Sequence, residues 1–233
     1  MKRIIAFDGL DCIGKSTVIN QLKEELIRSD YIPYVFHLTS PNKLYEEFFI
    51  SYNFGDLNHK VTDSIIQWSK FVELFNNIKI ILSANPHNIV ILDRTPYSEN
   101  IWNNFFNRQN SYQNTNILKQ FLQNFKDLNE EILYINLDVD NTILVNRILK
   151  KENDYKNYVN AFDSLYNKKY NNLYPNYNAD DISSKIYYMI NFLKEQFNKL
   201  FIELRYNNIE VKTLKNETES DINNIITTII NQL

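Results

Sequence analysis

Cysteine, glycine and long apolar runs are all scarce in this chain of 233 residues. The single cysteine, Cys12, excludes an internal disulfide framework and a cysteine-rich metal site, and it favours a reducing cytoplasm. No apolar run reaches the ~18 residues that a membrane span needs, and the apolar start is too short for a signal peptide. We therefore expect a cytoplasmic protein with no membrane partner, and no glycosylation of the Asn216-Glu217-Thr218 acceptor pattern.

The chain also has no excess of basic residues. The chain has 25 Lys and Arg against 28 Asp and Glu, so its net charge of -3 does not favour stable nucleic-acid binding. A mass of 27.9 kDa is enough for one large domain with a short lid. We expect a single domain over residues 1–233.

Short apolar runs alternate with longer segments of helical period along the chain. The run Asn88–Asp93, NIVILD, is apolar on both faces, as in a strand at the centre of a parallel sheet. Strands that are separated by helices favour parallel pairing, so the pattern predicts a three-layer α/β fold with a five-stranded parallel sheet flanked by helices. The predicted strands are Arg3–Asp8, Pro33–Leu38, Asn88–Asp93, Glu131–Leu137 and Ile209–Leu214. The predicted helices are Lys15–Ser29, Val61–Ala84, Pro96–Asn107, Asn114–Phe125, Asp140–Lys150, Tyr155–Leu173, Ile182–Tyr206 and Asp221–Gln232.

Two of the three glycines lie in the segment GLDCIGKS, which fits the phosphate-loop pattern G-x-x-x-x-G-K-[ST]. Gly9 and Gly14 allow the backbone to curl so that successive N–H groups point at phosphate oxygens. Lys15 supplies a positive charge, the Ser16 hydroxyl binds Mg²⁺, and the helix that starts there adds its dipole. Because a strand precedes the loop and a helix follows it, we predict a site for ATP and Mg²⁺. The expected ATP contacts within the loop are Gly9, Asp11, Cys12, Ile13, Gly14, Lys15, Ser16 and Thr17.

A second polar motif, LDRTPYSE, follows the predicted central strand. Asp93 and Arg94 end that strand, and they lie beside the phosphate loop in any sheet that places the first and third strands together. Asp93 is a candidate to hold Mg²⁺ or to act as a base, and Arg94 is suited to clamp an anionic group. Glu99 follows about one helical turn later, and we expect it to face the same cleft.

Three stretches of the chain resemble the thymidylate kinase and deoxynucleoside kinase branch of the P-loop kinases. They are FDGLDCIGKST at residues 7–17, LDRTPYSE at residues 92–99 and INLDVDNTILVNRILKKENDY at residues 135–155. The resemblance covers most of residues 2–173. It implies that Lys15 and Ser16 handle the donor phosphates and Mg²⁺, and that Arg94 lies near the acceptor phosphate and the transferred group. It also implies that Asp11 approaches the nucleotide sugar.

The resemblance further implies a lid at about residues 147–157 and a homodimer through helices that flank the sheet. Arg147, Lys150 and Lys151 match the lid cations that close over the donor. Family members often carry an arginine in the phosphate loop or in the lid. Because Cys12 occupies the loop position here, the stabilising cation would have to come from the lid.

The acceptor is less well specified, because the run FHLTSP after the second strand departs from the family. It holds neither the arginine of thymidylate kinases nor the glutamate base of nucleoside kinases. Arg94, Lys43 or His37 can replace the missing cation, whereas only Asp93 can replace the missing base. We therefore predict transfer to a dTMP-like deoxynucleoside monophosphate. The alternatives are the 5′-hydroxyl of a deoxynucleoside and, less favoured, a group on DNA.

The long second helix carries candidate base contacts in the segment SIIQWSKF. Gln67 can hydrogen-bond a base edge while Trp68 or Phe71 packs on the base face, although both aromatics are equally suited to core packing. A glutamine that reads the base is typical of nucleoside kinases, whereas thymidylate kinases use an arginine. The acceptor base therefore stays open, as does the choice between nucleoside and monophosphate.

Overall fold

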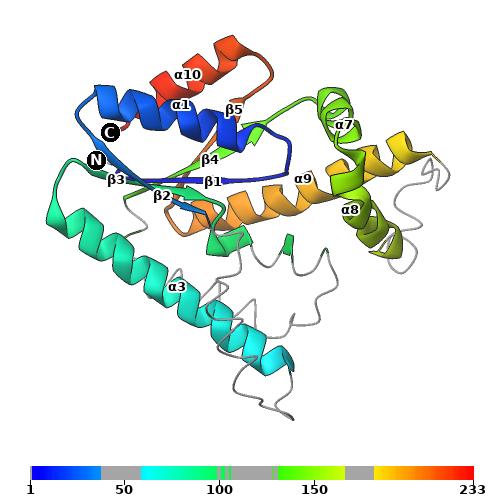
Figure 1. The fold of residues 1–233 in the computed structure, drawn as a ribbon, viewed down its shortest axis with the longest axis horizontal. Coiled ribbons are helices and arrows are strands. Elements are labelled where there is room, and N and C mark those ends of the chain that lie inside the picture. The colour runs from blue at the N-terminus through cyan, green and yellow to red at the C-terminus, as the bar shows by residue number, and fades with distance from the viewer. Residues whose placement is uncertain are drawn as a thin grey trace.

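The computed structural model describes residues 2–37, 59–98, 101, 102, 105, 128, 131–165 and 181–233. Within these, the side chains of residues 59–71, 96, 152–155, 157 and 165 are not described. The strands form one parallel sheet in the order β2-β3-β1-β4-β5, which confirms the predicted five-stranded sheet (Figure 1). The strands are β1 (Ile4–Asp8), β2 (Ile32–His37), β3 (Asn88–Asp93), β4 (Ile132–Asp138) and β5 (Glu210–Lys215).

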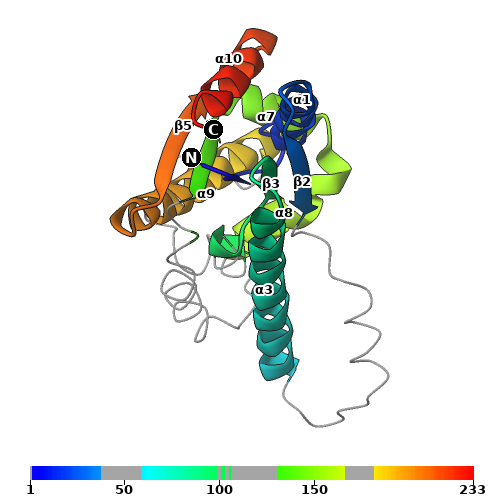
Figure 2. The same cartoon turned by 90° about the vertical axis from the view of Figure 1, so that its left-hand side faces the viewer.

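Helices cover both faces of this sheet and complete three layers. Helices α1 and α10 lie on one face, and α3 and α9 lie on the other (Figures 1 and 2). A loop leads from the central strand β1 directly into α1, as in the fold of the P-loop NTPases. The helices are α1 (Lys15–Arg28), α3 (His59–Ala84), the 3₁₀ turn η1 (Pro96–Ser98), α7 (Asn141–Leu149), α8 (Glu152–Leu165), α9 (Ile182–Tyr206) and α10 (Glu219–Ile230).

The three inner strands are buried on both faces. Every residue of β1 is buried, and β3 and β4 are buried over almost their whole length. Continuous burial requires the uninterrupted apolar runs that the sequence shows at these positions. The edge strands β2 and β5 are only partly covered, and their sequences are correspondingly more polar. This difference explains why the inner strands gave the clearest sequence signals.

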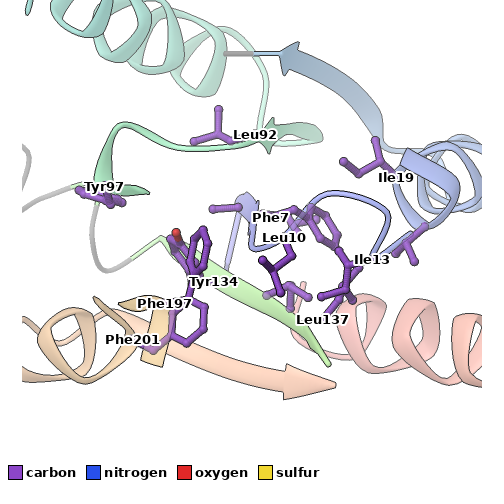
Figure 3. Close-up of a cluster of buried hydrophobic side chains, with 14 of the residues drawn as sticks. Phe7, Leu10, Ile13, Ile19, Leu92, Tyr97, Tyr134, Leu137, Phe197 and Phe201 are labelled. Carbon is purple, nitrogen blue, oxygen red and sulfur yellow. The ribbon is translucent and has the colours of Figure 1, made fainter. Parts of the chain in front are cut away.

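The phosphate-loop segment is fastened to the core by its apolar side chains. Leu10 is 4% exposed and Ile13 is 2% exposed. Figure 3 shows both among the buried side chains near Phe7 and Leu137. The apolar residues within the motif therefore hold the underside of the loop against the core.

Side-chain caps account for where several helices begin. Thr218 and Asp221 form a capping box, so α10 begins at Glu219, two residues before the predicted start. Asp140 caps α7 through the amides of Thr142 and Ile143. No helix in the described part of the chain has the length and apolar character needed to cross a bilayer.

Two predictions about helical segments need correction. The helix expected to begin at Pro96 is only a three-residue 3₁₀ turn there, although residues 101, 102 and 105 are helical. The charged stretch after α7 was not predicted to be helical, but only a turn at Lys150 and Lys151 separates α7 from α8. The predicted helix Asn114–Phe125 lies outside the described residues.

Candidate functional site

The loop between β1 and α1 has the backbone geometry of an anion-binding turn. Gly9 has φ 121°, Cys12 has φ 59° and Gly14 has φ 96°. Gly14 is the N-cap of α1, and because it has no side chain, no cap covers the first amides of the helix. These amides and the positive end of the helix dipole are therefore available to an anion.

A cavity of about 700 Å³ opens in front of this loop. Its walls come from four places: the loop and the start of α1, the end of β3, the end of α7, and the segment after β5. This volume lies within the range of ordinary small-molecule sites. The cavity brings together many of the residues predicted from sequence, namely Asp11, Cys12, Gly14, Lys15, Ser16, Thr17, Asp93, Arg94, Arg147, Lys150 and Lys151.

Lys15 is the most enclosed cation of the cavity and is only 7% exposed. Its Nζ donates to the carbonyl oxygens of Gly9 at 3.2 Å and Leu10 at 2.7 Å. It also lies 3.8 Å from Asp11 Oδ1. Burial lowers the pKa of Lys15, although the nearby carboxylate of Asp11 favours the charged form. The ammonium group is thus held inside the loop by oxygen atoms of the chain itself.

Arg94 and Asp11 form an ion pair across the cavity, with Arg94 Nη2 2.5 Å from Asp11 Oδ1. Tyr158 of α8 donates to the other carboxylate oxygen at 2.9 Å. Burial alone would raise the pKa of Asp11, but the charges of Arg94 and Lys15 outweigh it and lower the value. Burial and the same carboxylate raise the pKa of Tyr158 to about 12. The pair therefore stays ionised at neutral pH.

The backbone and an aromatic ring fix the direction of Arg94. Its φ of 68° is unusual for a residue with a side chain, and its amide donates to Phe7 O at 2.8 Å. The guanidinium carbon lies 4.8 Å from the ring centre of Trp102, which packs in turn against Tyr158. The Asp11 carboxylate and the Trp102 ring therefore both hold the Arg94 guanidinium group next to the loop.

Asp93 meets His37, because the two are register partners in the neighbouring strands β3 and β2. The His37 Nδ1 atom lies 2.9 Å from Asp93 Oδ2. Asp93 and the Ser16 hydroxyl both line the cavity and are oxygen ligands of the kind that Mg²⁺ prefers. In the described part of the chain, no three His, Cys, Asp or Glu side chains group into a metal site. Mg²⁺ at Ser16 and Asp93 would thus take further ligands from phosphate and water.

Sequence reasoning missed Asp8, which is fully buried directly before the loop. Its carboxylate accepts from the Thr95 amide at 3.2 Å and from Ser98 Oγ at 2.7 Å. It also accepts from the hydroxyls of Thr95 and Tyr134. Burial raises the pKa of Asp8 despite these donors. The group fixes the turn that follows Arg94, and its only sequence signal is a carboxylate that ends an apolar strand.

The cations at and just after the end of α7 also line the cavity. Arg147 Nη2 donates to the carbonyl oxygens of Asn216 at 3.4 Å and Glu217 at 3.3 Å. Lys150 and Lys151 line the cavity and are exposed. All three line the same cavity as the phosphate loop, and their role as lid cations stays a prediction.

Several predicted contacts lie elsewhere or outside the described residues. Gly9 and Ile13 line a second cavity, of about 320 Å³, on the α9 side of the loop. Because the Ile13 side chain is in the core, only its backbone is left to meet a ligand. The remaining predicted contacts cannot be placed: the side chains of Gln67, Trp68 and Phe71 are not described, and Lys43 and Glu99 lie outside the described residues.

No protein-family model and no curated protein matches the chain. Among solved structures, the chain is similar to the YorR protein of Bacillus subtilis, whose crystal structure is a complex with phosphorylated GDP. The two chains are 17% identical, with a TM-score of 0.47 over 98% of this chain and 94% of that chain. A similarity of this size shows no family membership, so the site is assigned from its own geometry.

Proposed function

We propose that this chain is a nucleotide kinase that transfers the γ-phosphoryl group of ATP to a deoxynucleoside monophosphate, of which dTMP is the first candidate. One observation carries the proposal. The loop, the uncapped start of α1 and Lys15 open into the same cavity as Arg94 and the cations that end α7. Such a gathering of amides and cations suits a polyphosphate and its transfer.

The donor phosphates would bind at the phosphate loop. Lys15 would exchange its bonds to Gly9 and Leu10 oxygens for bonds to phosphate oxygens. Ser16 and Asp93 would hold Mg²⁺, which when bound neutralises charge on the donor phosphates. Arg147 is already fixed to the segment after β5, so the donor would lie between that segment and the loop.

The transfer would join an oxygen of the acceptor phosphate to the γ-phosphorus as the bond from that phosphorus to the bridging oxygen breaks. ADP leaves, and no proton has to be removed from an acceptor that is already anionic. Arg94 is placed between the loop and the end of β3, where its charge would stabilise the moving group. Lys150 and Lys151 would add charge from the α7 side.

A second acceptor class is favoured by the contact between His37 and Asp93. A carboxylate 2.9 Å from an imidazole is a candidate general base, and a sugar hydroxyl needs one. In that case Asp93 would accept the hydroxyl proton while the hydroxyl oxygen attacks the γ-phosphorus. The chain would then be a deoxynucleoside kinase.

The test is phosphoryl transfer from labelled ATP with Mg²⁺ to dTMP, to thymidine and to the other deoxynucleosides and their monophosphates. We expect labelled dTDP. Lys15→Ala should abolish transfer, whereas Lys23→Ala, an exposed lysine further along α1, should leave it unchanged. Labelling of thymidine but not of dTMP would support the nucleoside acceptor. Labelling of neither class, or full activity of Lys15→Ala, would overturn the proposal.

A further inference from the structure

The side chain of Asn216 ties the last strand of the sheet to the phosphate loop. Asn216 directly follows β5 and is only 3% exposed. Its backbone amide donates to Asp138 O at 2.8 Å, which fixes its position beside β4. Its Nδ2 atom donates to Ile13 O at 2.7 Å, in a buried hydrogen bond. A buried amide is costly unless it is paired, so this bond holds both partners in place.

The carbonyl group that Asn216 binds belongs to the peptide between Ile13 and Gly14. Gly14 has a φ of 96° and no side chain, so the peptide before it can rotate at little cost. Rotation would carry the Ile13 oxygen away from its present direction and alter the direction of the Gly14 amide. An oxygen turned towards the cavity would repel phosphate oxygens. The Asn216 amide opposes this rotation.

The space around Gly14 shows how closely the two parts fit. A Cβ atom built on Gly14 would lie 2.5 Å from Asn216 Nδ2, far inside ordinary contact distance. Glycine is therefore required at this position both by the positive φ and by the approach of the asparagine. Gly14, the second glycine of the motif, therefore packs against a residue about two hundred positions later in the chain.

Asn216 also contributes to holding a cation of the site. Its carbonyl oxygen accepts from Arg147 Nη2 at 3.4 Å, and the next residue, Glu217, accepts from the same atom. One short segment thus contacts the back of the loop and the cation on α7, while both it and Arg147 line the 700 Å³ cavity.

From these contacts we propose that Asn216 is a positioning residue that keeps the phosphate loop in its anion-binding conformation. The proposal rests on the proposed function, since it assigns Asn216 to the binding of the donor phosphates. Asn216 would act through the Ile13–Gly14 peptide. No contact between Asn216 and the nucleoside part of the donor is proposed.

The test compares Asn216→Leu and Asn216→Ala with the wild-type protein. Leucine keeps a similar volume without the donor, and neither change adds a charge. Asn207→Leu is the matched control, because the Asn207 side-chain amide also donates to a backbone carbonyl group, that of Glu203 at 2.8 Å, at the exposed end of α9. Binding of ATP with Mg²⁺ and of inorganic tripolyphosphate is measured by calorimetry, and folding is checked by thermal unfolding.

We expect both Asn216 variants to bind ATP and tripolyphosphate about ten-fold more weakly, by the same factor for each, as for the loss of one positioned hydrogen bond. The control should bind as the wild type does. Unchanged affinity in a folded variant, with only a lower melting temperature, would overturn the proposal. So would a loss confined to ATP, because it would indicate a contact with the nucleoside.

Two further outcomes are distinguishable. Should neither variant fold, the Asn216 side-chain amide is followed in the wild-type protein by NMR. Slow hydrogen exchange and a resonance shift with tripolyphosphate would support the proposal. Exchange at the rate of an exposed amide would overturn it. If the wild type binds neither ATP nor tripolyphosphate, the proposed function fails, and the role of Asn216 fails with it. Binding by the wild type with unaffected variants removes only the role of Asn216.

Discussion

At the scale of single residues, two cations of the cavity, Lys15 and Arg94, are already held by acceptors of the same chain. Lys15 donates to two loop carbonyl groups, and Arg94 is paired with Asp11. A phosphate that enters must replace these partners, and it meets side chains that are already aligned. Because these side chains are already ordered, they lose less conformational entropy when a ligand binds.

The ion pair of Asp11 and Arg94 predicts a pH-dependent stability difference. Because the pKa of Asp11 is lowered in the folded protein, its contribution is present above the ordinary value of 3.8 and is lost as the pH falls through the folded value. Asp11→Asn should therefore be less stable than the wild type at neutral pH, by about 1.5–3 kcal/mol for a lost hydrogen bond between charged groups. Urea unfolding at several pH values measures this.

The difference between wild type and Asp11→Asn should shrink as the pH falls below 3.8. Asp138→Asn is a suitable control, because the Asp138 side chain is 57% exposed and pairs with Lys194 near the surface. A constant difference at every pH would mean that the charge of Asp11 does not stabilise the fold.

Residues within local motifs could be predicted, whereas residues whose partners are distant in sequence could not. The spacing of the phosphate-loop motif and the Asp93-Arg94 pair are visible in short segments, and the structure places them around one cavity. The role of Asp8 depends on Tyr134, and that of Asn216 on Ile13, over separations of 126 and 203 residues. Only the folded chain shows such pairs.

At the scale of elements, burial determined how well the sequence predicted each one. Strand β3 and helix α9 have the predicted bounds, since one is continuously apolar and the other has a long apolar stripe. The predicted helix at Pro96 failed for a tertiary reason. Thr95 and Ser98 bind the Asp8 carboxylate, and this holds the segment as a short turn.

The junction of α7 and α8 gives a prediction at the same scale. Lys150 and Lys151 form the turn and face the cavity, so changing both to alanine should lower the affinity for ATP or the rate of transfer by about ten-fold, as for a lost charge contact to phosphate. Lys199→Ala, an exposed lysine of α9, is the control and should change neither. Steady-state kinetics with varied ATP separates the two effects. Wild-type behaviour of the double variant would contradict a role for this turn.

At the scale of the whole molecule, the cavity depends on both ends of the sequence. The loop after the first strand supplies one wall, and the segment after the last strand supplies another. The N- and C-terminal segments also meet near the amino ends of the strands, where Lys2 N donates to Gln232 O at 3.4 Å (Figure 2). A ligand in the cavity would therefore contact elements from the beginning, middle and end of the chain, and it should stabilise the fold as a whole.

The central claim, that residues 9–17 grip a nucleoside polyphosphate, is tested most directly by backbone amide resonances of the labelled protein titrated with ATP and Mg²⁺. The account predicts that the largest shifts fall on residues 9–17 and Arg94, and that Lys15→Ala greatly reduces them. Amides of that segment that stay unmoved at saturating ATP, or shifts that Lys15→Ala leaves unchanged, would contradict it.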